Sequence, residues 1–395
     1  MILELLAGYF AIRTIEQVIA LHNVNLFLKK ELSVKKIILG QKKKIFIIIP
    51  VLNEKKIISE TVLYYKKELS HLPVVYVTTQ KEGSLKNNET VKAIKKTCED
   101  AQIIHYPRAE GNKASQVNYA LTLLEDKIAL NDYVAVFDAD SRPGPEMFEK
   151  ILCDKETPKA YQAFSNYFLE LNSKNKLAQA NAVYQTRWTY TFEMKNMINN
   201  YYKKRKNFMY VIGHGLFIQK NVWNRFSFPE ESVTEDIMYG YRLNIANIYP
   251  KPLPYFDFCT VPNSAAQAIK QSGRWFSGEL SFFKIIKPTR KSIFAYLNRL
   301  TYLLQWAFGP PVLLFLLFSA IRTNNSIVLL TVLGTLIVYL YGLHFQFIRT
   351  VKKNHLFFTL WFKGLLDCIG PFYGICKFIR KKLSKKEINF EKAAR

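Results

Sequence analysis

Apolar residues in the first half of the chain form short continuous runs, and segments with a helical period separate them. Four runs are rich in β-branched and aromatic residues: 45–51 (IFIIIPV), 74–79 (VVYVTT), 102–106 and 133–138 (YVAVFD). Three helical patterns accompany them: 55–69, 89–98 and 112–124. Continuous apolar runs are typical of strands buried on both faces of a parallel sheet. Strands that alternate with helices therefore predict an α/β fold with a mostly parallel sheet.

Two longer runs follow in the C-terminal third. Residues 300–321 carry no charged side chain, and residues 327–348 carry none apart from His344. A helix that crosses a hydrocarbon core of ~30 Å needs roughly 20 residues. Both runs therefore predict transmembrane helices, and a bilayer tolerates the kink expected from Pro310 and Pro311. The alternative is a pair of helices buried in a soluble domain.

Two further apolar segments contain charges. Residues 356–379 include three charged side chains and a Gly-Pro step. We interpret them as an interfacial or re-entrant segment, with a third span as the alternative. Residues 2–28 also include three charged side chains and lack a basic leader and a cleavage site, which argues against a cleaved signal peptide. This segment is either a poor span or an amphipathic helix on the membrane surface.

The net charge and its distribution along the chain help to predict where in the cell the protein is located. The net charge of +25 suits nucleic acid, an anionic bilayer or phosphorylated substrates, and the apolar C-terminal region favours the last two. The link at 322–326 is nearly neutral, whereas the outer flanks of both runs are basic. The positive-inside rule therefore predicts a multi-pass plasma-membrane protein with residues 30–298 and the tail in the cytoplasm. A nucleic-acid-binding protein would not need such spans. Five scattered cysteines without a CxxC pair indicate reduced thiols rather than a disulfide framework or structural zinc.

Acidic side chains follow two of the predicted strands. Asn53-Glu54 comes after the first strand, and Asp138 and Asp140 come at the end of the fourth. Ligands of such sheets bind at the carboxyl ends of the strands. Two carboxylates one residue apart can hold a divalent ion against a nucleotide diphosphate. The alternative is a surface turn, which the sequence SRPGP at 141–145 would also fit.

The tripeptide Thr234-Glu235-Asp236 precedes another helical stretch. One interpretation is helix capping, in which Thr234 caps and the two acids complement the helix dipole. The other makes Asp236 a general base that takes a proton from an acceptor hydroxyl.

Three further motifs contain residues that could bind a ligand. Arg274 of QSGRW (271–275) can bind a diphosphate bidentately and Trp275 offers a flat face to a sugar, although an amphipathic membrane-surface helix would look the same. Lys113 at a predicted helix start suits a phosphate, or is simply solvated. Gly213-His214-Gly215 lets backbone approach a ligand closely, although a lone histidine is more often structural.

In this order, the motifs PVLNE, GNKASQVNYAL, DAD, GHG, TED and QSGRW resemble those of the membrane-bound family 2 glycosyltransferases, which include cellulose, chitin and hyaluronan synthases. The resemblance covers residues 43–280 and extends to the flanking spans. It implies a GT-A fold, a nucleotide-sugar donor, a Mg2+ or Mn2+ ion and inversion at the anomeric carbon.

The resemblance also implies roles for individual residues. Asp138 and Asp140 would bind the metal, and Asp236 would be the catalytic base. The donor would contact Pro50, Asn53, Glu54, Thr79, Lys113, Asp138, Gln271 and Arg274. The acceptor would contact Gly213, His214, Gly215, Glu235 and Trp275.

One departure concerns the nucleotide base. The family usually has acidic residues after its second strand, where this chain has Thr78, Thr79 and Gln80. The sequence therefore does not identify the nucleotide base, and we expect uridine. The membrane part is also small, so a polymer channel would need a homo-oligomer or an export partner.

Together these points predict an inverting hexosyl- or N-acetylhexosaminyl-transferase at a membrane with anionic lipids. It would use a UDP-sugar to extend a lipid-linked or growing glycan acceptor in cell-surface polysaccharide or glycolipid synthesis. The alternative is an inactive, glycosyltransferase-like binding or assembly module. The expected domains are a membrane-associated or transmembrane helix (1–30), the GT-A domain (31–280), a basic linker (281–299), the membrane region (300–379) and a basic tail (380–395).

Overall fold

The structure is a computed structural model that describes residues 1–33, 43–168, 173–232, 234–285, 287–290, 293–344, 346–348 and 356–384. Most of the predicted basic tail and part of the basic linker lie outside these ranges. The chain divides into two compact units, which are described separately. The sheet unit comprises the described residues of Lys30–Asn166 and Met197–Cys259. The helical unit comprises Met1–Lys29, Tyr167–Asn196 and the described residues from Thr260 on.

The sheet unit contains one eight-stranded sheet with the order β3-β2-β1-β4-β7-β6-β8-β5. Its strands are β1 Ile45–Pro50, β2 Val74–Thr79, β3 Gln102–Tyr106, β4 Tyr133–Val136, β5 Arg142–Pro143, β6 Ala160–Asn166, β7 Leu216–Gln219 and β8 Lys251–Phe258. The four strands predicted from continuous apolar runs are confirmed, and they pair in parallel. The other half of the sheet is mixed, because β7 runs antiparallel to β4 and β6.

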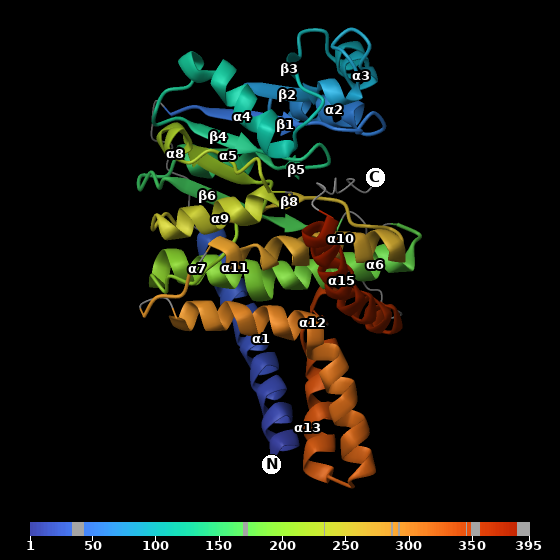
Figure 1. Cartoon of the computed structure of the whole chain (residues 1–395). Coiled ribbons are helices and arrows are strands. Elements are labelled where there is room, and N and C mark those ends of the chain that lie inside the picture. Colours follow the sequence, from blue (N-terminus) through green and yellow to red (C-terminus); the bar gives the residue numbers. More distant parts are fainter. Residues whose placement is uncertain are drawn as a thin grey trace. The chain divides into compact units, whose positions relative to one another are not determined.

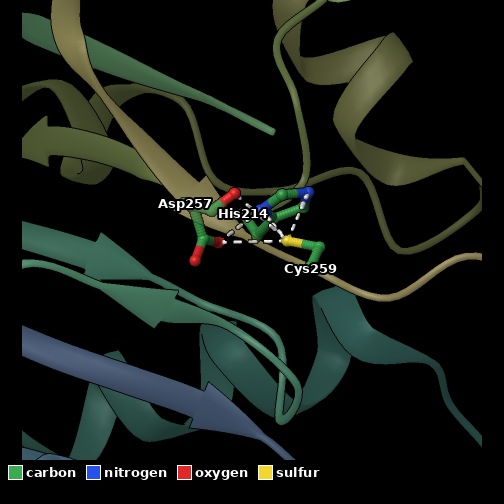
Figure 2. Close-up of side chains that lie close together, drawn as sticks. All are labelled: His214, Asp257 and Cys259. Carbon is green, nitrogen blue, oxygen red and sulfur yellow. Dashed lines mark hydrogen bonds and ion pairs between the residues drawn. The ribbon is translucent and has the colours of Figure 1, made fainter. Parts of the chain in front are cut away.

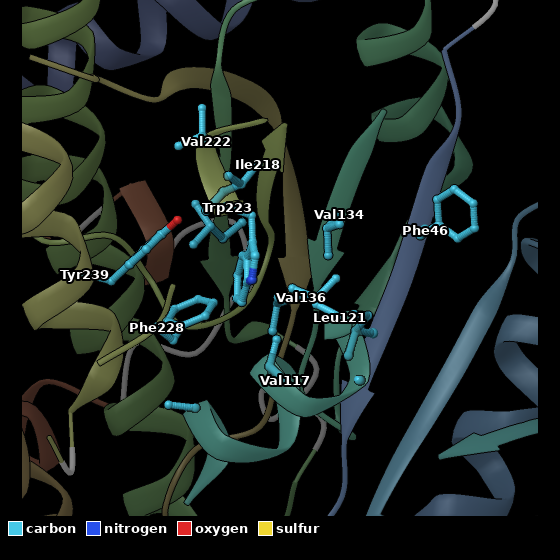
Figure 3. Close-up of a cluster of buried hydrophobic side chains, with 14 of the residues drawn as sticks. Phe46, Val117, Leu121, Val134, Val136, Ile218, Val222, Trp223, Phe228 and Tyr239 are labelled. Atoms are coloured by element: carbon cyan, nitrogen blue, oxygen red, sulfur yellow. The ribbon is translucent and has the colours of Figure 1, made fainter. Parts of the chain in front are cut away.

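Helices cover both faces of this sheet (Figure 1). They are α2 Ile58–Glu68, α3 Glu89–Thr97, α4 Lys113–Leu123, α5 Pro145–Leu152, α8 Lys220–Arg225 and α9 Glu235–Ile245. The chain passes from one unit to the other within α7 Lys195–Lys203. Alternate residues of β1 pack into hydrophobic clusters on opposite faces of the sheet. Ile47 packs with Tyr65 of α2 on one face. Phe46 belongs to the cluster on the other face, which includes Val117 of α4 and Trp223 of α8 (Figure 3). Burial on both faces explains why the β1 sequence shows no polar alternation.

The helical unit contains α1 Ile2–Ser33 up to Lys29, α6 Lys176–Trp188, α10 Ala265–Leu280, α11 Phe282–Ile285, α12 Ile293–Arg322, α13 Ser326–Ile337 and α15 Leu356–Ser384. Helices α1, α12 and α13 lie side by side (Figure 1), and Phe10, Leu316 and Val332 share one apolar cluster between them. Pro310 and Pro311 lie inside α12. In Figure 1 this helix changes direction along its length, as proline in a helix interior predicts.

In the described part of the chain, two helical segments are long and apolar enough to cross a membrane: Ile293–Arg322 and Ser326–Ile348. They contain the two predicted spans. Only 22% and 28% of the most apolar stretch of each segment is buried inside the protein. Length and composition support membrane association here, whereas the topology stays a prediction.

The segment predicted as interfacial, re-entrant or spanning is the helix α15, which packs along α10, α6 and α12. Its contact with α10 is close at Gly273. A Cβ atom at Gly273 would lie 2.7 Å from Cδ1 of Tyr373 and 2.8 Å from the carbonyl oxygen of Gly370. The glycine of QSGRW therefore permits this helix contact.

Candidate active site in the sheet unit

The residues predicted after the first two strands lie at neighbouring strand ends. Pro50 ends β1 and Thr79 ends β2. Asn53 has a left-handed backbone (φ 59°), which asparagine tolerates better than most residues. Its N–H donates to Oε1 of Glu82 at 2.9 Å. Glu54, next in the chain, is buried.

The second strand end also contains an acid that the sequence interpretation missed. Oε1 of Glu82 accepts hydrogen bonds from the Asn53 N–H and from Oγ1 of Thr90, each at 2.9 Å. On the neighbouring strand β3, His105 contacts Thr78 Oγ1 through Nδ1 at 2.9 Å and Gln80 Oε1 through Nε2 at 3.2 Å. No acid follows β2 directly, but Glu82 provides a carboxylate three residues after the end of this strand.

Lys113 occupies the first turn of α4. A capping box between Asn112 and Ser115 starts this helix. The Lys113 Nζ atom lies 2.6 Å from Oδ1 of Asp138 and 2.6 Å from the carbonyl oxygen of Gly213. The lysine is only partly exposed, so it is not the solvated side chain of the alternative interpretation.

Three carboxylates act on this ammonium. Burial lowers the pKa of Lys113, but the negative charges of Asp138, Glu235 and Asp236 raise it by more. The pKa of Lys113 therefore lies above its ordinary value, and the side chain stays cationic. A lysine that stays cationic can bind a phosphate oxygen through a charge-assisted hydrogen bond.

The DAD segment forms a tight turn after β4. The Ser141 N–H donates to the Asp138 carbonyl oxygen at 3.1 Å, and the Asp138 N–H donates to Ser141 Oγ at 3.2 Å. The Asp138 carboxylate is partly exposed, and Asp140 is buried on the same turn. Two carboxylates on one turn provide the hard oxygen ligands that Mg2+ and Mn2+ prefer, so these residues fit a divalent ion.

The GHG and TED motifs meet at Gly213 and Asp236. A Cβ atom at Gly213 would lie 2.7 Å from Oδ2 of Asp236, so only glycine leaves room for this carboxylate. Asp236 lies in the first turn of α9, as predicted. Thr234 takes the N-cap position, but its side chain makes no capping hydrogen bond. The capping interpretation is therefore wrong for Thr234, and Asp236 faces the GHG segment.

The histidine of GHG belongs to a buried polar cluster (Figure 2). His214 contacts Asp257 Oδ2 through Nδ1 at 2.7 Å and Ser165 Oγ through Nε2 at 3.0 Å. Cys259 Sγ lies 3.7 Å from His214 Nδ1. Burial lowers the pKa of His214, whereas the hydrogen bond and charge of Asp257 raise it, and the net shift is upward. Gly215, which follows His214, enters β7 with a left-handed backbone.

Asp257 is the second acid that the sequence interpretation missed. Its only signal is a lone carboxylate in the strand sequence KPLPYFDF. A fully buried acid needs partners, because desolvation of an unpaired charge is costly.

The QSGRW residues lie on α10 of the helical unit. Within that unit, Gln271 Oε1 accepts a hydrogen bond from Gln185 Nε2 of α6 at 3.0 Å. The structure thus gathers Lys113, Asp138 and Asp236 in the sheet unit. Gln271, Arg274 and Trp275 belong to α10 of the helical unit.

Comparisons with known proteins found one matching family and several similar solved structures. The sequence profile of Glycosyl transferase family group 2 matches residues 133–344, which is more than half of the chain. The chain is similar to the mannosyltransferase PcManGT from Pyrobaculum calidifontis, solved with GDP-Man and Mn2+, with 15% identity and a TM-score of 0.54 over 92% of this chain and 99% of that chain. A glucosyl-3-phosphoglycerate synthase from Mycobacterium tuberculosis matches at 11% identity and a TM-score of 0.38, over 62% and 82% of the two chains. No curated protein sequence matches. The chain belongs to glycosyl transferase family group 2 and has the GT-A fold.

Proposed function

We propose that this chain is an inverting, metal-dependent glycosyltransferase that moves a hexosyl or N-acetylhexosaminyl group from a nucleoside-diphosphate sugar to an acceptor at a membrane surface. The observation that supports this most strongly is the gathering of Lys113, Asp138 and Asp236 around Gly213. It combines a cation for a diphosphate, a carboxylate for a metal and a second carboxylate that can act as a base.

Each residue has a distinct task in this proposal. Asp138 and Asp140 would hold Mg2+ or Mn2+, which neutralises the charge of the departing diphosphate when bound. Lys113 donates to a diphosphate oxygen. Asp236 takes the proton of the acceptor hydroxyl as that oxygen attacks the anomeric carbon. Gln271, Arg274 and Trp275 cover the diphosphate and the acceptor, while Glu235 and the 213–215 segment line the acceptor side.

The donor base is the least constrained part. Pro50, Asn53, Glu54 and Thr79 form the donor side at neighbouring strand ends. Uridine is the expectation from the sequence, whereas the similar solved structure contains GDP-Man. Both UDP-sugars and GDP-sugars therefore belong in the first screen.

The acceptor is a lipid-linked or growing glycan on the cytoplasmic face of the plasma membrane, where anionic lipids attract the basic flanks. The two apolar helical segments support membrane association. With native cysteines replaced, a cysteine introduced at Asn324 should react with a reagent added outside intact cells, and one at Lys386 should not. Labelling at Lys386 would reverse the proposed orientation of the tail.

A donor screen tests the catalytic proposal. Purified protein in detergent, Mn2+ or Mg2+, and a panel of nucleotide sugars with a lipid-linked acceptor should release nucleoside diphosphate with one donor class. Excess EDTA or Asp140→Asn should abolish the release. Nucleotide binding without any release would favour the inactive binding module, which is the alternative function.

A further inference from the structure

We propose that Asp257 is the positioning residue of this site, because its carboxylate holds the DAD turn and the GHG histidine at the same time. The inference rests on the proposed function, since it concerns how the metal-binding turn is kept in place. Asp257 lies on β8 and is 0% exposed. No motif of the sequence includes it.

Four donors converge on this carboxylate. Oδ1 accepts from the Arg142 N–H at 2.9 Å. Oδ2 accepts from Ser141 Oγ at 2.5 Å and from Cys259 Sγ at 3.5 Å, and it contacts His214 Nδ1 at 2.7 Å. A carboxylate can accept all of these bonds, whereas an amide would present a donor to some of the same groups.

The Ser141 hydroxyl connects Asp257 to the metal-binding turn. It donates to Asp257 and accepts from the Asp138 N–H, so one hydroxyl joins the buried acid to the first residue of DAD. The N–H of Arg142, the next residue and the first of β5, is held by the other carboxylate oxygen. These hydrogen bonds from the buried Asp257 therefore hold the turn that carries Asp138 and Asp140 in place.

The other half of the network fixes the GHG segment. Nδ1 of His214 is held by Asp257, and the His214 carbonyl oxygen accepts from Gln162 Nε2 at 2.9 Å. The segment begins at Gly213, which contacts Lys113 and lies against Asp236. A substitution of Asp257 should therefore disturb both the DAD turn and the GHG segment, because hydrogen bonds connect Asp257 to each of them.

Two other roles for this cluster are less well supported. Ser165, His214 and Asp257 have the order of a nucleophilic triad, but Ser165 is only 1% exposed and offers no access to a substrate. A zinc site of His214, Asp257 and Cys259 would require Nδ1 and Oδ2 to approach one ion. Their 2.7 Å separation is instead that of a hydrogen bond.

The test compares Asp257→Asn and Ser141→Ala with the control Asp154→Asn. Asp154 is also a largely buried acid in the sheet unit, and its carboxylate binds Lys251 of β8 at 2.7 Å without contacting the DAD turn. Mn2+ binding is measured by electron paramagnetic resonance, UDP and GDP binding by calorimetry, and folding by thermal unfolding. The kinetic constants for the donor are then measured on the same preparations.

Asp257→Asn and Ser141→Ala should weaken Mn2+ binding by about 10–100-fold, the usual effect of losing a residue that orients metal ligands. The value of kcat should fall with it. Asp154→Asn should lower thermal stability yet keep the parental Mn2+ affinity. Ser141→Ala removes only a hydroxyl, so it tests the link even if Asp257→Asn fails to fold.

Parental Mn2+ affinity in folded Asp257→Asn or Ser141→Ala would overturn the positioning role alone. A parent protein that binds neither Mn2+ nor nucleoside diphosphate would overturn the proposed function, and the positioning role with it. Stoichiometric zinc in the purified parent that Cys259→Ser removes would make the cluster a metal centre and would also overturn the proposal.

Discussion

The Nζ atom of Lys113 lies 2.6 Å from Oδ1 of Asp138, and the two residues are 25 positions apart in the chain. The same ammonium donates to the carbonyl oxygen of Gly213, 100 positions away. One lysine therefore connects the GNK, DAD and GHG motifs in a way that none of the three shows alone. A diphosphate and a metal ion would both have to bind beside this ion pair.

Replacing Lys113 should separate metal binding from donor binding. In Lys113→Met, the ammonium no longer competes for Asp138, so Mn2+ alone should bind about tenfold more tightly. The diphosphate loses a charge-assisted hydrogen bond, so kcat/KM for the donor should fall about 10–100-fold. Paramagnetic resonance and initial rates measure the two effects. Lys92→Met, which breaks an exposed ion pair with Glu89, should change neither. Weaker Mn2+ binding in Lys113→Met would contradict this explanation.

The His214–Asp257 pair should make stability depend on pH with a defined sign. The folded pKa of His214 lies above its ordinary value. Its stabilisation is therefore complete below the unfolded pKa of about 6.5 and is lost as pH rises through the folded pKa. The difference in melting temperature between the parent and His214→Asn should shrink as pH rises from about 6 to 9.

His105 provides a comparison with the opposite sign. Burial lowers the pKa of His105, so its contribution to stability should grow as pH rises toward about 6.5. Thermal unfolding of the parent and of His105→Asn from about pH 4 to 7 measures this. If both histidine variants show the same trend, the pKa directions inferred from their contacts are wrong.

The contact between α10 and α15 should be sensitive to a single methyl group. In Gly273→Ala, the new Cβ would lie 2.7 Å from Tyr373 and 2.8 Å from the Gly370 carbonyl oxygen. Such overpacking typically destabilises by about 1–3 kcal/mol. Gly364 on α15 has no atom within 4 Å of the position of a Cβ, so Gly364→Ala should be neutral or stabilising by up to about 1 kcal/mol. Thermal unfolding in detergent distinguishes the two, and equal stability would show that the helices do not pack this closely.

The sequence predicted the first half of the sheet because β1, β2 and β4 are buried on both faces and form continuous apolar runs. The remaining strands gave weaker signals. β5 has two residues, β7 has four, and β8 contains two prolines and an acid. Local pattern alone therefore cannot distinguish them from loops.

The candidate site was predictable to a similar extent. Asp138 and Asp236 lie in motifs whose order carries the family resemblance. Asp257 contacts Ser141 across 116 positions and His214 across 43, so tertiary structure alone joins them. Glu82 lies outside the predicted site because it comes three residues after the strand end rather than directly at it.

The most direct test of the catalytic assignment is the single-turnover rate of Asp236→Asn with the donor that the screen identifies. If Asp236 is the base, its loss removes proton acceptance and should slow sugar transfer by about 10²–10⁴-fold. Donor affinity, titrated on the same preparation, should stay close to that of the parent. A near-parental rate would contradict the assignment, reduce Asp236 to an acid in the first turn of α9 and favour the binding-module alternative.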